Sequence, residues 1–144
     1  MSDFMGIKVL IVDNNSFIAK TLYSILDAFG IRTILMSSSL EEAEKMFYNK
    51  RIDVVFVDFM MEKRSGINFI KNVRNSKTDK NGSDVPIILD TGMTDIDTIT
   101  LARDAGVTEV IGKPFSPDQV FQKLYNALYN KRDFIDVDEY VGPT

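Results

Sequence analysis

The sequence predicts an α/β protein in which a parallel five-stranded sheet is covered by helices on both faces. Short, almost wholly apolar runs alternate strictly with longer amphipathic segments along the chain. The apolar runs are rich in β-branched residues and lack the polar alternation of a sheet with one solvated face, which indicates strands buried on both sides. The chain has 144 residues, enough for one domain with a substantial core.

The strands are expected where these apolar runs lie. The first reads IKVLIV and the third reads DVVFV, both typical of fully buried strands. Segments of ten or more residues separate the runs, which suits helical crossovers between parallel strands. The five strands are expected at 7–12, 32–36, 53–57, 85–89 and 108–112.

The helices are expected to begin at capping residues. Ser16 is a suitable N-cap for the first helix. Ser39, with Glu42 three residues later, forms a capping-box pattern. Ser116 is followed by Pro117, a residue favoured at the first position of a helix. The five helices are expected at 16–30, 39–50, 66–75, 95–106 and 116–132.

Residues 1–132 therefore form one expected domain, and residues 133–144 break the pattern. This last stretch, DFIDVDEYVGPT, holds four acids and neither Lys nor Arg. It is expected to be an acidic tail, a docking segment or the start of a linker to an output domain.

Composition excludes several function classes. The net charge is −4 with no long basic run, which disfavours direct nucleic-acid binding. The chain contains no Cys and no His, so thiolate metal sites and histidine bases are absent. The first residues are too polar for a signal peptide, and no apolar run is long enough to cross a membrane. We expect a cytoplasmic protein with no membrane partner.

Polar residues follow the strands where a parallel sheet gathers its ligand site. Asp13, Asp58, Thr91 and Lys113 each come at or just after a strand end, and adjacent central strands would bring them together. Neighbouring carboxylates need a compensating cation, which Mg²⁺ and the lysine would supply. Asp90 precedes Thr91, so it is expected on the opposite face, capping the next helix or accepting a bond from a loop amide.

The motifs KVLIVDNN, DVVFVDFMM, PIILDTG and GKPF, in this order and spacing, resemble the receiver domain of two-component response regulators. The resemblance covers roughly residues 7–130. It implies a flavodoxin-like (βα)5 fold, with a doubly wound five-stranded sheet in the order 2-1-3-4-5.

The resemblance also implies the roles of the site residues. Asp58 would accept a phosphoryl group, with Mg²⁺ held by Asp13, Asp58 and the backbone carbonyl of Met60. Thr91 and Lys113 would bind phosphoryl oxygens. Asn14, through water to the metal, and the Gly92 amide, toward the phosphoryl group, complete the implied set, and the bond before Pro114 is commonly cis in this family.

The implied function is signalling rather than general enzyme catalysis. A histidine kinase or a phosphotransfer protein would donate the phosphoryl group, and the chain would catalyse only this transfer and its own slow dephosphorylation. The added charge would change the face made by the fourth helix, fifth strand and fifth helix, through which an output partner, an output domain or a second copy would bind. Met60 and Met93 flank the expected path of the attacking water and cannot orient it strongly, which favours slow dephosphorylation.

Four positions depart from the family pattern. Glu62 replaces a proline that often follows the methionine after the phosphoacceptor, which is expected to alter the loop over the site. Asn14 stands where most receivers have a second acid, so Mg²⁺ is expected to bind more weakly than usual. Val110 occupies the position of the usual aromatic switch residue, which leaves Phe115 as a substitute or the switch absent. Asp90 lies where the family usually has a small or apolar residue.

Two alternative functions stay open from the sequence. A receiver-like module that only binds a partner would be compatible with Asn14, Val110 and Asp90. A phosphatase of the haloacid dehalogenase type would use Asp13 as its nucleophile, but the chain offers no further acid pair at a late strand end and no cap domain. Nucleotide binding is disfavoured because both glycine-rich phosphate-binding motifs are missing.

Overall fold

The computed structural model describes residues 4–61, 66–76, 78, 80–93, 95–137 and 140–144, so the expectation for Glu62 lies outside the described residues. Its centre is a five-stranded parallel sheet in the order β2-β1-β3-β4-β5, which confirms the predicted fold class and strand order. The strand sequences are almost entirely apolar because both faces are covered. The strands are β1 (Lys8–Val12), β2 (Thr33–Ser37), β3 (Val54–Asp58), β4 (Ile87–Thr91) and β5 (Glu109–Gly112).

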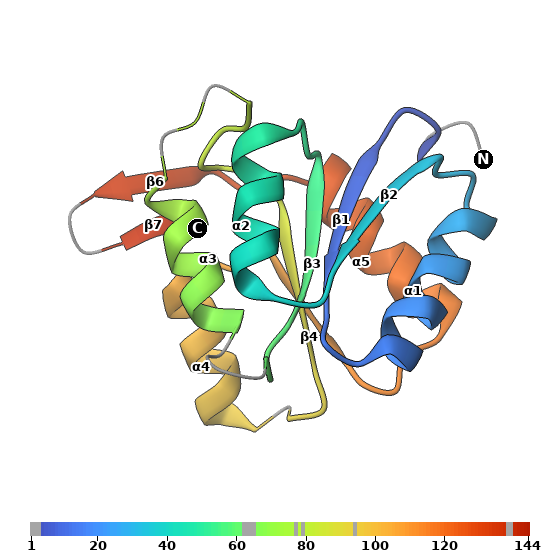
Figure 1. Ribbon diagram of the computed structural model, residues 1–144. Coiled ribbons are helices and arrows are strands. Elements are labelled where there is room, and N and C mark those ends of the chain that lie inside the picture. Colours follow the sequence, from blue (N-terminus) through green and yellow to red (C-terminus); the bar gives the residue numbers. More distant parts are fainter. Residues whose placement is uncertain (1–3, 62–65, 77, 79, 94, 138–139) are drawn as a thin grey trace.

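Two helical layers cover the sheet (Figure 1). One apolar cluster joins the sheet to α1 and α5, and a second joins its other face to α2, α3 and α4. None of the described helices is long and apolar enough to cross a membrane. The helices are α1 (Ser16–Ala28), α2 (Leu40–Asn49), α3 (Gly66–Arg74), α4 (Ile96–Ala105) and α5 (Pro117–Tyr129).

The helix ends show how local sequence fixes these boundaries. Ser116 caps α5 in a complete capping box with Gln119, and the Oγ of Ser39 accepts the amide N–H of Glu42 at 3.1 Å. The expected cap at Ser16 is wrong by one residue, because the Oδ1 of Asn15 accepts the amide N–H of Ile18 at 3.1 Å.

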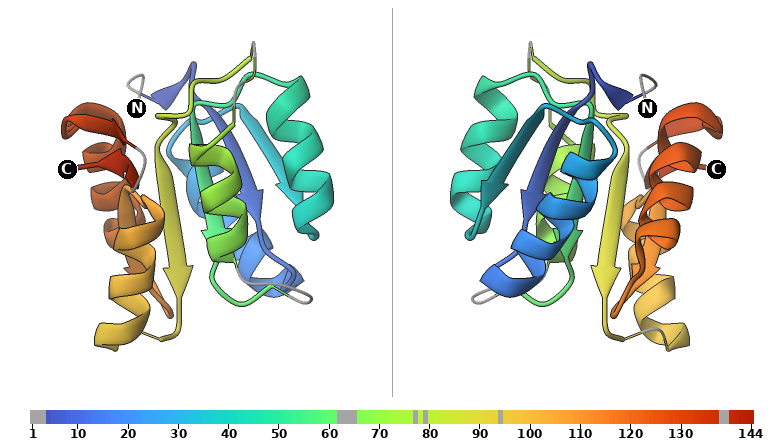
Figure 2. Two further views of the ribbon diagram at one scale, coloured as in Figure 1. Left: turned by 90° about the vertical axis from the view of Figure 1, so that its left-hand side faces the viewer. Right: turned by 90° about the vertical axis from the view of Figure 1, so that its right-hand side faces the viewer.

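All five strands deliver their carboxyl ends to the same edge of the sheet, where the arrowheads lie in Figure 2. The register between β3 and β4 pairs Asp58 with Asp90. Residues paired in this way project to the same face, so these acids lie beside each other. Phe56 and Ile88, two residues earlier on each strand, belong to the cluster packed under α1 and α5, which identifies the shared face.

Residues near the C-terminus form an element that the sequence did not predict. β6 (Phe134–Val137) and β7 (Tyr140–Pro143) pair as an antiparallel ladder beside α3 and α4 (Figure 1). β7 packs against α4 so closely that a Cβ added to Gly142 would lie 2.6 Å from the Cα of Gly106. The described part of residues 133–144 is therefore packed on the domain rather than extended from it.

Arg74 joins this hairpin to the rest of the fold. Its side chain is almost fully buried, with 2% exposure. The guanidinium donates to the carbonyls of Gly106, Ser83 and Val85 at 2.8, 2.8 and 2.6 Å, and its carbon lies 5.5 Å from the centre of the Phe134 ring. This one side chain connects the end of α3, the loop before β4, the end of α4 and the hairpin.

Candidate functional site

The candidate site lies at the carboxyl edge of the sheet and contains three buried carboxylates. Asp13 follows β1, Asp58 ends β3, and Asp90 lies in β4, with exposures of 3%, 5% and 1%. The fold therefore brings together Asp13 and Asp58 as predicted and adds Asp90 to them. Burial of three acids in one place requires a compensating cation.

Lys113 supplies that cation within the protein. Its Nζ lies 2.9 Å from the Oδ1 of Asp58, 3.1 Å from the Oδ1 of Asp90 and 3.7 Å from the Oδ2 of Asp13. The side chain starts just beyond β5, and the peptide bond from Lys113 to Pro114 is cis. One ammonium group is thus shared among three carboxylates.

The predicted partners of Asp90 are wrong, although its predicted face is right. Asp90 does point away from the side of Thr91, but its ion pair is with Lys113, and it does not cap α4. The N-cap of α4 is Asp95. Among the described residues no hydrogen bond reaches either carboxylate oxygen of Asp90. The lysine ion pair is therefore the interaction that balances this buried charge.

Burial and mutual repulsion set the protonation of the group. Burial raises the pKa of Asp13, and the nearby Asp58 carboxylate raises it further, while the amide of Asn15 opposes both. Burial raises the pKa of Asp90 to about 7, although Lys113 opposes the shift. Burial alone would lower the pKa of Lys113, but Asp90, Asp58 and Asp13 outweigh it and raise that pKa. The lysine is therefore charged at neutral pH.

Asp90 makes stability depend on pH. Its folded pKa of about 7 exceeds an unfolded value near 3.9, so the folded state retains a proton that the unfolded chain releases. This contribution is fully present below about pH 4 and is lost as pH rises through about 7. Urea unfolding in EDTA, followed by circular dichroism, gives the difference in unfolding free energy between Asp90→Asn and the unmutated protein. From pH 5 to pH 8 this difference should shift in favour of Asp90→Asn by roughly 2–4 kcal/mol. Parallel pH profiles of the two proteins would contradict this assignment.

The donor atoms present fit a magnesium ion. The Oδ1 of Asp13 accepts the amide N–H of Asn15 at 2.8 Å, whereas its buried Oδ2 has no hydrogen-bond donor among the described residues. The Oδ1 of Asp58 accepts from Lys113 and from the amide of Met60 at 3.2 Å. No group of three acids in the described chain is arranged to hold a metal together, but Mg²⁺ needs only one or two carboxylates and completes its shell with water. Asn14 lies exposed next to Asp13.

Thr91 lies at the same edge but contacts different atoms. Its hydroxyl accepts the amide N–H of Met93 at 2.9 Å and lies 3.3 Å from the Met93 carbonyl oxygen, and Gly92 between them is exposed. Val110 packs with the cluster beneath α2, α3 and α4, whereas Phe115 packs with the cluster beneath α1 and α5. Phe115 therefore does not replace Val110 in contact with the threonine side of the sheet.

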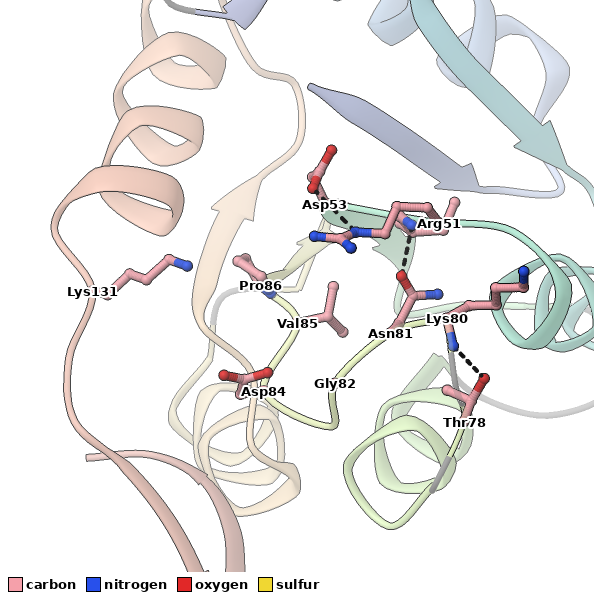
Figure 3. Close-up of a pocket in the computed structure, with 11 residues that line it drawn as sticks. Arg51, Asp53, Thr78, Lys80, Asn81, Gly82, Asp84, Val85, Pro86 and Lys131 are labelled. Carbon is pink, nitrogen blue, oxygen red and sulfur yellow. Dashed lines mark hydrogen bonds and ion pairs between the residues drawn. The ribbon is translucent and has the colours of Figure 1, made fainter. Parts of the chain in front are cut away.

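Two cavities differ in their relation to this site. One of about 260 Å³ opens beside Asp13 and Asn14, between the start of α1 and the end of β2. The other, of about 390 Å³, lies at the opposite edge of the sheet (Figure 3). There Asn81 accepts the amide N–H of Ile52 at 2.7 Å and donates to the carbonyls of Phe47 and Lys50. We assign a structural role to the region around this second cavity, because the buried carboxylates lie at the opposite edge of the sheet.

Comparison with known sequences shows which family the chain matches. The family described as the response regulator receiver domain matches residues 9–125. The probable transcriptional regulator ycf27 of Guillardia theta is 34% identical over 121 residues, which are 84% of this chain and 45% of that protein. The chemotaxis protein CheY1 of Helicobacter pylori is 30% identical over 122 residues, which are 84% of this chain and 96% of that protein. The chain thus spans about half the length of the ycf27 relatives.

Solved structures agree with the sequence comparison. The chemotaxis protein CheY4 of Vibrio cholerae has a TM-score of 0.76 and 27% identity, with 85% of this chain and 98% of that chain covered. The beryllofluoride-activated NtrC4 receiver domain dimer has a TM-score of 0.75 and 29% identity, with 85% and 97% covered.

Proposed function

Since the chain belongs to the response regulator receiver domain family of two-component signalling proteins, we propose that it accepts a phosphoryl group on Asp58 and passes this signal to a partner. The observation that carries the proposal is the ion pair of 2.9 Å between Lys113 and Asp58, beside the Oδ2 of Asp13, which accepts no hydrogen bond from the described residues. This arrangement joins a nucleophilic carboxylate, a cation for phosphoryl oxygens and a free ligand for a metal.

The proposed transfer uses Asp58 as the nucleophile. One of its carboxylate oxygens forms a bond to phosphorus while the phosphorus–nitrogen bond of a phosphohistidine breaks. The imidazole nitrogen keeps the electron pair of the broken bond, and the product on this chain is an acyl phosphate. The donor histidine would belong to a sensor kinase or a phosphotransfer protein, since this chain contains no His.

The other residues would stabilise charge on the transferring group. Lys113 is already 2.9 Å from Asp58 and would bind a phosphoryl oxygen there. Thr91 would exchange its contact with the Met93 backbone for a second phosphoryl oxygen, and the Gly92 amide would donate to the same group. Mg²⁺ bound by Asp13, Asp58 and the Met60 carbonyl, with Asn14 acting through water, would neutralise further negative charge.

The output would follow from the movement of Thr91. Phosphorylation adds about −1.5 to −2 charges beside the β4–α4 loop, which gives the threonine a new acceptor. The face of α4, β5 and α5 would respond and bind an output partner, an output domain or a second copy. We propose no aromatic switch, because Val110 is aliphatic and Phe115 packs on the opposite face.

Intact mass spectrometry after incubation with acetyl phosphate tests the proposed acceptor. The unmutated protein should gain one phosphoryl group in the presence of Mg²⁺ and almost none in EDTA, and Asp58→Asn should gain none. Asp53→Asn is the matched control, since Asp53 lies at the other end of β3. Modification that survives in Asp58→Asn but disappears in Asp13→Asn would favour the phosphatase alternative. No gain in any protein would favour a module that only binds partners.

The same spectra, recorded over time after the donor is removed, measure the lifetime of the phosphoryl group. Met60 and Met93 are both exposed beside the site, and neither side chain orients water by a strong hydrogen bond. We therefore expect slow dephosphorylation. Loss of the added mass within seconds would contradict it.

A further inference from the structure

Asp90 is the member of the buried carboxylate group to which the proposed phosphoryl transfer assigns no role. Its side chain is 1% exposed, and its Oδ1 lies 3.1 Å from the Nζ of Lys113. Apart from this ion pair, no donor among the described residues reaches either oxygen. Burying a carboxylate with a single ion-pair partner costs folding free energy. We therefore look for a role of Asp90 that acts through Lys113.

The charge of the pocket changes sharply if Asp90 is left out. When all four groups are ionised, Asp13, Asp58 and Asp90 together with Lys113 carry a formal charge of −2, and without Asp90 this would be −1. The neighbouring position 14 is a neutral amide and adds no charge. The negative charge of Asp90 therefore lies next to the ammonium group of Lys113, which it offsets, rather than on the side of Asp13.

Lys113 and a divalent cation would draw on the same oxygens. The Nζ of Lys113 is 2.9 Å from Asp58 and 3.7 Å from Asp13, the two carboxylates assigned to Mg²⁺. Without Asp90, the ammonium group would have only these acids as ion-pair partners among those that surround it here. A lysine drawn fully onto them would oppose the entry of a second positive charge.

We propose that Asp90 is a positioning residue, which holds Lys113 by an ion pair and so keeps the carboxylate oxygens of Asp13 and Asp58 available to a divalent cation. This compensates in part for the amide at position 14. The inference rests on the proposed function, because it takes the magnesium site of that function as given. It concerns Mg²⁺ binding in the unphosphorylated protein and can be measured without any phosphoryl transfer.

Isothermal titration calorimetry with MgCl₂ tests the proposal on the full chain at about pH 8.5. The sequence contains no Trp, so heat is a more direct signal than fluorescence. Asp90→Asn should weaken Mg²⁺ binding about tenfold. Asn14→Asp should tighten binding and serves as the positive control. Asp27→Asn removes an exposed acid of α1 and should leave the affinity unchanged.

A double-mutant cycle with Lys113→Met separates positioning from a general structural defect. If Asp90 acts by holding the lysine, Asp90→Asn should change the affinity less than twofold once Lys113 is absent. A tenfold effect that persists in the Lys113→Met background would overturn the positioning role, as would unchanged or tighter binding by Asp90→Asn alone. If Asp90→Asn does not fold by circular dichroism, Asp90→Val provides the same cycle with an apolar side chain.

The outcomes distinguish this inference from the proposed function. Mg²⁺-dependent phosphorylation of Asp58 with no effect of Asp90→Asn on Mg²⁺ binding would overturn only the role of Asp90. Absence of both phosphorylation and Mg²⁺ binding in the unmutated protein would overturn both.

Discussion

Replacing Arg74 by methionine should lower the free energy of unfolding by about 3–5 kcal/mol. The guanidinium donates to three carbonyl groups and lies 3.3 Å from the Oγ1 of Thr108, all in a nearly solvent-free environment. Burial lowers its pKa to about 10, so it stays charged at neutral pH. Methionine fills similar space but donates nothing, so the carbonyls of Gly106, Ser83 and Val85 would lose their donor inside the protein. Urea unfolding monitored by circular dichroism measures the loss.

Arg103→Met is the matched control for this substitution. Its side chain is 75% exposed and pairs with the exposed Asp104 at 3.5 Å, so the same chemical change should cost less than about 0.5 kcal/mol. The loss of unfolding free energy for Arg74→Lys should lie between those of the two methionine variants, because an ammonium group keeps the charge but cannot reach all the acceptors. A loss of less than 1 kcal/mol in unfolding free energy for Arg74→Met would show that the hydrogen bonds of Arg74 contribute little to stability.

Gly66→Ala should damage both stability and phosphorylation. A Cβ at this position would lie 2.2 Å from the backbone carbonyl oxygen of Asp58 and 3.1 Å from a methyl group of Val57. Either the backbone at Asp58 or the start of α3 must therefore shift to admit the methyl group. We expect a loss of roughly 1–3 kcal/mol in unfolding free energy and at least a tenfold slower phosphorylation by acetyl phosphate.

Gly6→Ala controls for the general effect of adding a methyl group. Nothing lies within 4 Å of a Cβ built there, and the backbone is not in the left-handed region. This variant should match the unmutated protein in stability and in phosphorylation rate. Alanine normally favours helices over glycine, so a Gly66→Ala protein of raised stability and normal rate would mean that β3 and α3 separate easily.

The sequence was sufficient for the fold and for part of the site. Buried strands between amphipathic helices leave few arrangements, and a parallel sheet collects its strand ends at one edge. The sequence therefore predicts Asp13, Asp58 and Lys113 at one site, and the Nζ of Lys113 does lie within 3.7 Å of both carboxylates.

The remainder depended on contacts between distant segments. The alternation of side chains along β4 predicts the face on which Asp90 lies. It does not predict that the side chain of Lys113, which starts beyond β5, reaches Asp90 on that face. Arg74 reads as an ordinary basic residue in the last turn of a helix, and only the assembled loops bury it. The strands β6 and β7 are short, and their docking depends on the close approach of Gly142 to Gly106.

The pairing of Asp58 with Asp90 across β3 and β4 also bears on how uniquely the sheet can assemble. Both strands are apolar enough to align in more than one way, and hydrophobic contact alone discriminates weakly between such alignments. A slip of β4 by one residue would turn Asp90 toward the apolar cluster under α2, α3 and α4 and away from Lys113. An unpaired carboxylate there would cost several kcal/mol. The ion pair between Asp90 and Lys113 thus penalises misaligned sheets. This contribution to correct strand alignment is not revealed by a measurement of native stability.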